Sequence, residues 1–476
     1  MKKNILFLLL SLLCLGGCKK KDITPRITAS QTALYFSDWG TAPQTLTYST
    51  VDAVSVAVSS VSTGWTPVVD QATNTLTVTP PASADLGYDR SGIVILTALS
   101  KDSVSSSVTI YLYVCDVDQF DEPANCHIAT RANTRYRFLP KRGDGSAVEA
   151  SSAKLLWQSG YGLVDNVALE TDGAISFFVG ETEKGTCPDG NAVIGACDAS
   201  GNVVWSWHIW VASNSPIDEA VTYANGQSYM ARNLGAYTNS NGSHDTQKIL
   251  DSYGLYYQWG RKDPFLRPAS YECAGGEDEV VVDEQGAYVT FTTEQTSASV
   301  GTMEYATAHP TTFIANAAAI AEGGDGVGDW LATPNNTLWG DGSTKSVNDP
   351  CPAGWRVPTA QEWSVLTLSA EQDATPLSEA RKQYGWFLTD GSNQYFYLGA
   401  GYHRYNDGVL QNMNYKEDVY PSQPEPWEGY YWSSTPSGNL ASCLFFDLTT
   451  TRLANKFNNN LASRRANAMQ VRCVKE

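Results

Sequence analysis

Residues 349–363 read DPCPAGWRVPTAQEW, and the end of this segment carries the clearest helix start in the sequence. Thr359 is a favourable N-cap residue, and Glu362 follows three positions later, which is the spacing of a capping box. Trp363 and Leu366 would then lie on one face of the helix and turn inward. The sequence therefore predicts a capped helix that begins after Thr359, and a second short helix is expected over residues 377–384.

The region around this helix, residues 213–476, has few other helical patterns and is rich in Gly, Asn and aromatic residues. Long loops cost backbone entropy that few apolar contacts offset. We therefore expect a loop-rich α+β domain here, held by aromatic packing and by cross-links.

The segment before this domain, residues 203–210 (VVWSWHIW), alternates as a strand with large side chains on both faces. Trp205 and Trp207 share one face, and His208 and Trp210 share the other. Two interpretations are open: a tryptophan ledge on which sugars stack, or a strand buried on both sides between two domains. The second is the commoner use of aromatic area, and it makes His208 a hydrogen-bonded interface residue and not a ligand.

The first part of the chain, residues 23–114, is rich in Ser, Thr and Val and contains short alternating runs such as 75–79 (TLTVT) and 108–114 (VTIYLYV). Short strands separated by turns are typical of an immunoglobulin-like β-sandwich. An acidic linker follows over residues 115–123, after which strands resume.

The length of 476 residues corresponds to about three domains. We expect a multidomain chain of two all-β immunoglobulin-like sandwiches followed by the α+β domain. The expected ranges are a leader over 1–18, a sandwich over 19–117, a second sandwich-like domain over 118–212 and the loop-rich domain over 213–476.

Residues 1–18 (MKKNILFLLLSLLCLGGC) have a positive start, an apolar run and small residues before Cys18, which is the pattern of a lipoprotein signal peptide. The apolar run is shorter than the roughly 20 residues of a membrane-spanning helix. Cleavage before Cys18 and acylation of its thiol would anchor the chain stably in a membrane. Lys19, Lys20 and Lys21 then serve either as a spacer near the lipid headgroups or as part of an export signal.

The charge balance excludes nucleic acid as a partner. The chain carries 32 basic and 50 acidic residues, for a net charge of −18, and loss of the leader makes it more acidic. Phosphate binding needs clustered cations, and the one basic cluster lies beside the anchor.

Ten cysteines are present, and eight remain after the leader and Cys18 are set aside. An even number in an oxidising compartment permits disulfides. A hairpin turn at residues 189–190 would separate Cys187 from Cys197, so we do not expect them to pair. The five histidines are scattered and no Cys-x-x-Cys occurs, so no zinc site is expected.

Two sets of sequence blocks carry family resemblance. In the C-terminal region five blocks occur in order, and they are 229–236 (YMARNLGA), 256–261 (YYQWGR), 349–359 (DPCPAGWRVPT), 431–435 (YWSST) and 471–474 (VRCV). Together they resemble the Fibrobacter succinogenes major paralogous domain, which implies a fold similar to C-type lectins and formylglycine-generating enzymes, a cell-surface role and no established reaction. Residues 34–37 (LYFS), 64–65 (GW) and 89–95 (DRSGIVI) resemble the BACON domain of Bacteroidetes surface proteins.

Cys351 precedes the capped helix and Cys473 lies in the last strand, so a disulfide between them would close a very long loop. Pairing of Cys273 with Cys443, or of Cys115 with Cys126, stays open. Three arginines inside the blocks lie beside aromatic residues, and we expect them to stack or to pair with buried carboxylates. They are Arg232, Arg261 and Arg356.

The candidate ligand-binding residues lie in the long aromatic loop after residue 395, which carries the ligand in C-type-lectin-like folds. Three of them offer flat faces for a sugar ring and three offer hydrogen bonds, and the six are Tyr402, Tyr405, Trp427, Asn406, Asp407 and Glu428. The alternative is that these aromatic residues only pack the loops. The calcium motifs of sugar-binding lectins are absent, and the aspartates at 325–329 and 341 lack the spacing of a calcium loop. Calcium is therefore a possible but unsupported ligand.

No motif for catalysis is present: the chain lacks a Gly-x-Ser-x-Gly elbow and a phosphate-binding loop, and its many acids do not single out a glycosidase pair. The hypothesis is a non-catalytic lipoprotein of the outer membrane that faces the cell surface and binds a glycan, mucin or protein. The alternatives are a structural subunit of a fimbria-like or outer-membrane assembly and an enzyme related to formylglycine-generating oxidases. We expect no cofactor besides the lipid on Cys18, and the sequence leaves the oligomeric state open.

Overall fold

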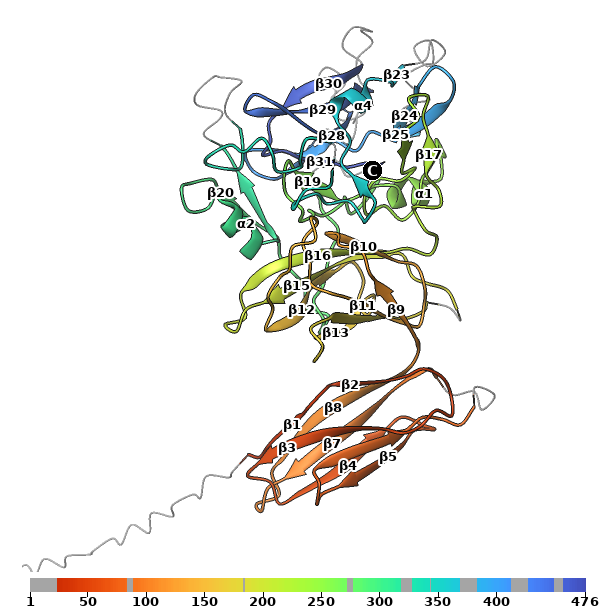
Figure 1. Ribbon diagram of the computed structural model, residues 1–476, viewed down its shortest axis with the longest axis vertical. Coiled ribbons are helices and arrows are strands. Elements are labelled where there is room, and N and C mark those ends of the chain that lie inside the picture. Colours follow the sequence, from red (N-terminus) through yellow and green to blue (C-terminus); the bar gives the residue numbers. More distant parts are fainter. Residues whose placement is uncertain are drawn as a thin grey trace, which may run out of the picture. The chain divides into compact units, whose positions relative to one another are not determined.

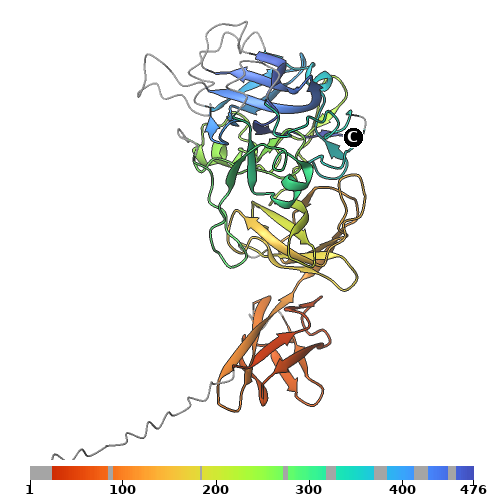
Figure 2. The same cartoon turned by 90° about the vertical axis from the view of Figure 1, so that its left-hand side faces the viewer.

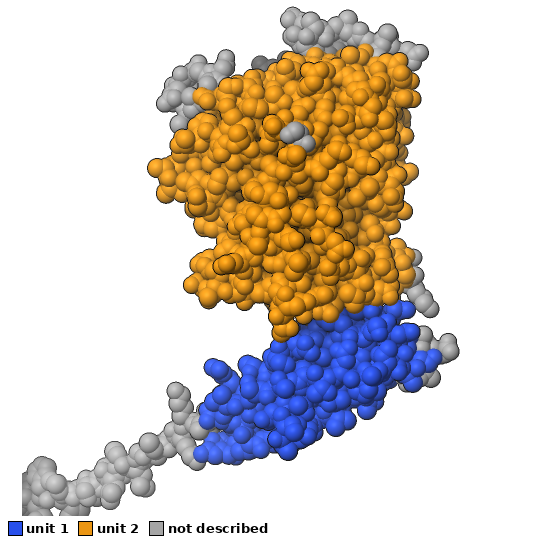
Figure 3. All heavy atoms as spheres, in the orientation of Figure 1, with its two compact units in different colours: residues 1–115 blue, residues 116–476 orange. Residues whose placement is uncertain are grey.

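The computed structural model describes residues 24–83, 89–182, 185–271, 277–317, 328–342, 344–368, 383–411, 427–448 and 457–476. Within these ranges the chain is mostly β and forms several sheets. It divides into two compact units, Met1–Cys115 and Asp116–Glu476 (Figure 3). The boundary between the two units follows Cys115, two residues before the domain boundary expected after residue 117. Residues 118–212 and 213–476, which we expected as separate domains, lie within one compact unit.

The first unit contains two four-stranded sheets, in the orders β1-β3-β6-β5 and β2-β8-β7-β4. The strands of the first sheet are β1 (Arg26–Ala29), β3 (Gln44–Val51), β6 (Thr75–Thr79) and β5 (Thr66–Asp70). Those of the second are β2 (Ala33–Phe36), β8 (Ser105–Val114), β7 (Ser91–Leu99) and β4 (Ser55–Val61). Both sheets contribute to one apolar core, so the expected all-β character of this region is confirmed.

The alternation of side chains in β6 shows why this core forms. Leu76 and Val78 are fully buried, while the threonines between them are half-buried, because successive residues of a strand point to opposite faces. Trp65 belongs to the same core. Gly92 in β7 lies against it, and a Cβ there would come within 2.7 Å of the indole nitrogen, so this position requires glycine.

The second unit begins with two more four-stranded sheets, in the orders β13-β14-β11-β9 and β10-β16-β15-β12. The first consists of β13 (Asp165–Leu169), β14 (Ile175–Val179), β11 (Thr134–Phe138) and β9 (Asp116–Phe120). The second consists of β10 (Cys126–Ala129), β16 (Val203–Val211), β15 (Gly190–Cys197) and β12 (Ser152–Gln158). Figure 1 shows the second sheet between the first sheet and the C-terminal part of the same unit.

The central strand β16 is buried on both faces, as the second interpretation of its sequence predicted. Trp205 and Trp207 belong to the core between the two sheets, whereas Trp210 belongs to the core of the C-terminal part. His208 is 2% exposed and bonds Asn191 Oδ1 through Nε2 at 2.9 Å. The tryptophans therefore join two layers and form no exposed ledge.

The C-terminal part of the second unit contains four sheets among its described residues. One comprises β17 (Val221–Thr222), β18 (Ser228–Tyr229), β32 (Val474–Lys475) and β22 (Trp355–Arg356). The largest comprises β27 (Leu410–Gln411), β26 (Tyr402–His403), β31 (Ala468–Gln470), β28 (Glu428–Ser437), β29 (Leu440–Asp447), β30 (Phe457–Ser463) and β19 (Tyr256–Gln258). The small sheets are β20 (Thr292–Gln295) with β21 (Thr312–Ala315), and β23 (Thr367–Leu368) with β24 (Gly385–Thr389) and β25 (Gln394–Leu398).

Three short helices are described beside these sheets: α1 (Thr246–Asp251), α2 (Met303–Ala308) and α4 (Ala360–Trp363). The predicted capping box at α4 is present, since Thr359 and Glu362 exchange their side-chain and backbone hydrogen bonds. Trp363 and Leu366 are fully buried. The second expected helix falls mainly on residues 369–382, outside the described residues, and Tyr384 lies in a turn.

The five sequence blocks meet at the two strands at the end of the chain. β32 pairs with β18 and with β22, and β31 pairs with β19 and with β28. Blocks that lie up to about 240 residues apart in sequence therefore surround residues 471–474. Figure 2 shows the C-terminal part of this unit, coloured green to blue, from a second side.

Candidate ligand-binding site

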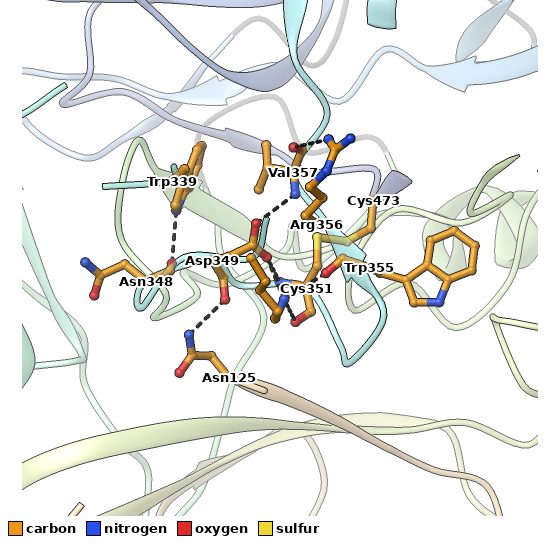
Figure 4. The surroundings of a disulfide bond; sticks show 10 residues. Asn125, Trp339, Asn348, Asp349, Cys351, Trp355, Arg356, Val357 and Cys473 are labelled. Carbon is orange, nitrogen blue, oxygen red and sulfur yellow. Dashed lines mark hydrogen bonds and ion pairs between the residues drawn. A yellow bond between two sulfur atoms is a disulfide. The ribbon is translucent and has the colours of Figure 1, made fainter. Parts of the chain in front are cut away.

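A disulfide joins Cys351 to Cys473, the pair expected from the layout of the chain. Beside it, Asp349 accepts the backbone N–H groups of Cys351 and Val357, each at 2.9 Å (Figure 4). Lys345 donates to the same carboxylate at 2.8 Å and to the carbonyl of Trp355 at 2.8 Å. These buried groups satisfy one another, and they hold the segment before α4 in place.

The remaining cysteines form no second described bridge. Cys126, Cys187, Cys197 and Cys443 are buried thiols. The expected separation of Cys187 from Cys197 is therefore correct, and the alternative bridge between Cys115 and Cys126 is wrong. Cys273, the alternative partner of Cys443, lies outside the described residues. Burial raises the pKa of the Cys126 and Cys443 thiols well above the usual range, which keeps them in the unreactive neutral form.

The three arginines of the sequence blocks have the structural roles expected of them. Arg232 pairs with Glu219, and Arg356 pairs with Glu362 at 2.7 Å. Arg261 lies against the rings of two aromatic residues, 5.1 Å from Phe265, and donates to backbone carbonyls. None of the three leaves a charge available to a ligand at the surface.

The predicted ligand loop forms the hairpin between β26 and β27, and three of the six candidate residues lie at its tip. Tyr405 receives the guanidinium of Arg464 on its ring, 4.5 Å from the centroid. Its backbone N–H donates to Asn467 and its carbonyl accepts from Asn316. Tyr405 is half-buried, so only part of its surface remains for a sugar.

Asp407 pairs with Arg404 three residues earlier, and it also accepts the N–H of Val409 at 3.1 Å. Its carboxylate therefore stabilises the hairpin. Asn406 lies between these residues and is half-buried. Its Oδ1 is buried and has no hydrogen-bond partner among the described residues. Asn406 is the one candidate in the hairpin whose side-chain acceptor is unused.

Tyr402 and Glu428 come together next to this hairpin, through Tyr430. The hydroxyl of Tyr430 donates to Glu428 at 2.8 Å, and its ring meets that of Tyr402 edge to face with centroids 4.9 Å apart. Burial, followed by the charge of Glu428, raises the pKa of Tyr402. The two residues are half-buried and belong to a packed cluster.

Trp427 lies elsewhere, and its burial contradicts its predicted role as a sugar platform. Its side chain is 3% exposed and belongs to the core around Trp363 and Tyr431. Its indole N–H donates to the carbonyl of Gly399 at 3.0 Å. The ring cannot stack on a ligand from this position, because almost all of its surface is buried in the core.

A cavity of about 320 Å³ opens next to β17 and β25. We call it the tyrosine crevice. Its rim carries Val221, Asn239, Asn241 and Gln394, and its floor carries Tyr223, Tyr395, Phe396 and Arg472. The rim residues are exposed or half-buried and the floor residues are buried. Cavities of this size, with an apolar floor and a few polar groups, are typical of small-molecule sites.

Stacked tyrosines build the floor. The ring of Tyr223 stacks on Tyr395 at 3.9 Å and on Tyr229 at 4.1 Å. Its hydroxyl bonds that of Tyr397 at 2.7 Å. Tyr395 donates to Asp390 at 2.7 Å, and burial raises its pKa. These bonds hold the rings rigidly, as a preformed binding surface requires.

Two further cavities lie in the same unit. A small well of about 10 Å³ shares four residues with the tyrosine crevice, which are Ala231, Asn239, Phe396 and Arg472, and it is also lined by Ser240. The other cavity, of about 530 Å³, lies at the end of the YWSST block and is lined in part by Asn336, Thr337, Ser434 and Thr435. It offers hydroxyl and amide groups but no aromatic face.

The described residues contain no group of three potential metal ligands, and no described helix has the length and apolarity to cross a membrane. Asp329, one of the aspartates considered for calcium, is 3.2 Å from Arg465 and accepts the N–H of Leu331. Asp325 and the lipidation site Cys18 lie outside the described residues.

Sequence reasoning missed the tyrosine crevice. Tyr395 and Phe396 stand in the sequence at the start of the aromatic region where we expect the ligand, and Asn239 and Gln394 carry no motif. Arg472 lies in the last sequence block, which was the one signal that pointed to this place. The crevice forms from segments that are far apart in sequence, so no local pattern marks it.

Comparison with known proteins assigns no family. No family model matches the chain, and no curated protein matches it. Among solved structures, the D00-D0 domain of intimin matches at 12% identity over 39% of this chain and 98% of that chain, with a TM-score of 0.16. The protocadherin gammaB4 extracellular domain matches at 13% identity over 39% of this chain and 34% of that chain, with a TM-score of 0.16. The SGBP-B protein of a Bacteroides ovatus mixed-linkage glucan utilization locus, in complex with a mixed-linkage heptasaccharide, matches at 9% identity over 40% of this chain and 45% of that chain, with a TM-score of 0.12. At these scores none of them defines the fold or the function of this chain.

Proposed function

We propose that this protein is a non-catalytic surface lipoprotein that is anchored through Cys18 and binds a glycan with its C-terminal part. The tyrosine crevice carries this proposal. It combines buried aromatic rings with three amide side chains at its rim, from Asn239, Asn241 and Gln394. Amides can donate to and accept from sugar hydroxyls, and aromatic rings cover the apolar faces of a sugar.

The size of the crevice favours one or two sugar units. At about 320 Å³ it falls at the lower end of the range for small-ligand sites, roughly 300 to 1,000 Å³. A terminal or side-chain residue of a larger glycan would enter it while the rest of the chain lies over the exposed rim.

The proposed fold assigns an immunoglobulin-like sandwich to the first unit and a second one to the two sheets that begin the second unit. The C-terminal part would be C-type-lectin-like. The convergence of the five blocks on the last two strands and the bridge between Cys351 and Cys473 support this assignment. In this arrangement the first sandwich acts as a spacer between the lipid anchor and the binding part.

A glycan array probed with the soluble chain from Lys19 to Glu476 tests the binding function. Asn239 is half-buried at the rim, so Asn239→Trp should fill the crevice and abolish the signal. Asn460 in β30 is exposed, and Asn460→Trp is the matched control that should keep it. A chain that binds no glycan, or an Asn239→Trp variant that binds normally, would overturn the proposal.

The hairpin of Tyr405 and Asp407 is the competing location for the ligand. Tyr405→Ala removes its ring and should leave binding unchanged if the crevice is the site. Loss of binding in Tyr405→Ala, with normal binding in Asn239→Trp, would move the site to the hairpin.

Anchoring is tested separately, on intact cells. Cys18→Ser removes the acylated thiol and should release the protein into the soluble fraction. Protease added to cells that carry the unaltered chain should digest it. A chain that stays protected would place the protein in the periplasm and exclude a surface role.

A further inference from the structure

Arg472 carries a buried positive charge that no described carboxylate neutralises. The residue is 4% exposed. Its guanidinium donates to Asn233 Oδ1 at 3.1 and 3.0 Å and to the carbonyl of Phe396 at 2.9 Å. It lies 4.0 Å from the ring centroid of Tyr397. All of these partners are neutral, and the described residues place no acid within ion-pair distance of it.

The other buried arginines of the same region show how unusual this is. Four of them pair with a carboxylate, and they are Arg232, Arg267, Arg356 and Arg465. Arg261 is the second exception, and it lines none of the cavities described above. A buried charge without a partner is costly, and this chain has an excess of acids from which a partner could come. Arg472 is thus the buried cation that both lacks an acid and lines a cavity.

Ser240 provides a second, independent observation at the same place. Its side chain is 4% exposed, and its hydroxyl has no hydrogen-bond partner among the described residues. It lines the small well together with Arg472. A well of about 10 Å³ has room for about one oxygen atom. The hydroxyl of Ser240 and the guanidinium of Arg472 are both donors, so an anionic oxygen satisfies both.

The walls of the crevice and of the well contain no acid. A negatively charged group that enters therefore meets no like charge in the lining. The amides of the rim and the tyrosine floor remain available to the neutral part of the ligand. The donors of the well and the amides of the rim together match a sugar ring that bears one acidic substituent.

We infer that the tyrosine crevice binds an acidic sugar residue, a carboxylated pyranose, and that Arg472 and Ser240 receive its carboxylate. This inference rests on the proposed glycan-binding function and names its ligand class. The ring lies against the floor between the amides of Asn239 and Gln394, and the carboxylate points to the well. Charge-assisted hydrogen bonds of this kind are about twice as strong as neutral ones, so they set the specificity.

The test compares matched pairs of glycosides that differ only at one carbon. Methyl β-glucuronide is paired with methyl β-glucoside, and methyl β-galacturonide with methyl β-galactoside, and each is titrated into the soluble chain from Lys19 to Glu476. We expect the acid of at least one pair to bind at least about tenfold more tightly than its neutral counterpart. Saturation-transfer NMR or calorimetry provides the affinities.

Ser240→Ala is the decisive variant, because replacement of Arg472 would break the contacts that join three segments of the fold. The hydroxyl of Ser240 has no partner, so its removal should leave the thermal midpoint unchanged. It should weaken binding of the acid about tenfold and leave binding of the neutral glycoside unchanged. Ser434→Ala is the matched control, since Ser434 also has a buried hydroxyl without a partner but lines the other large cavity.

The outcomes separate this inference from the proposed function. Equal affinity within each pair, or a Ser240→Ala variant that binds the acid normally, overturns the acidic ligand. The glycan-binding proposal then still stands if Asn239→Trp abolishes the array signal. Absence of any glycan signal for the unaltered chain overturns both.

Discussion

Removal of the bridge between Cys351 and Cys473 should destabilise the second unit by about 5 kcal/mol. The two residues are separated by 122 positions. Closing a loop of that length removes about 16 cal/mol/K of entropy from the unfolded chain, which corresponds to about 4.9 kcal/mol at 25 °C. The double variant Cys351→Ala/Cys473→Ala loses this constraint, while both positions stay buried and apolar.

Urea unfolding followed by hydrogen-exchange mass spectrometry measures the effect on each unit separately. Peptides of β28, β31 and β32 should lose protection at lower urea in the double variant. Peptides of β6 and β7 should not change, because the first unit has no part in the bridge. Cys126→Ala, which removes a buried thiol but no cross-link, is the control for the loss of sulfur packing.

A loss below about 1 kcal/mol would refute the entropic argument, whose expected range reaches about 5 kcal/mol. It would mean that the pairing of β32 with β18 and β22 carries the stability of this region without the cross-link. Equal losses in both units would also refute it, since the bridge closes a loop of the second unit only.

Three further perturbations test the energetics of single groups by urea unfolding. Thr359→Ala removes the capping box at α4 and should cost about 1 kcal/mol, and Thr359→Ser should keep most of it. Lys262→Met leaves the carboxylate of Asp263 buried without its cation and should cost about 3 to 5 kcal/mol, whereas the double variant Lys262→Met/Asp263→Asn should recover part of that loss. Burial lowers the pKa of His127 to about 3, below its unfolded value of about 6.5. Its contribution to stability is therefore complete above pH 6.5 and is lost as the pH falls toward 3. His127→Phe keeps the ring between Phe120 and Phe138 and should make the stability less dependent on pH in that window, and an unchanged slope would contradict the assignment.

The strands and the capped helix could be predicted from the sequence because their signals are local. In β6 the alternation of Leu76 and Val78 with threonine fixes which face is buried. At α4, Thr359 and Glu362 are three residues apart, so the sequence contains the whole capping box. The division into units could not be predicted in the same way. β16 has large side chains on both faces, but the sequence does not say whether the layer that covers Trp210 belongs to another domain or to the same core.

The exposure of the candidate ligand residues could not be predicted as well, because aromatic composition does not distinguish a ring that binds a ligand at the surface from a ring that packs in the core. Trp427 and Tyr405 belong to the same loop region, yet one is buried in the core and the other is half-buried beneath Arg464. The difference depends on partners from distant segments. The long region between them, residues 412–426, lies outside the described residues, so most of the predicted loop is untested.

Arg472 shows how the bridge and the proposed site depend on each other. Its partner Asn233 lies 239 residues earlier and its partner Phe396 lies 76 residues earlier, so the last block brings the guanidinium to them only when the end of the chain is held in place. Cys473 follows Arg472 directly and is tied to Cys351. The bridge therefore positions the one buried cation of the crevice that lacks an acid. A chain whose bridge is open should lose affinity for an acidic ligand before it loses its folded structure, because placing a charge within hydrogen-bond distance tolerates less movement than packing of the core does.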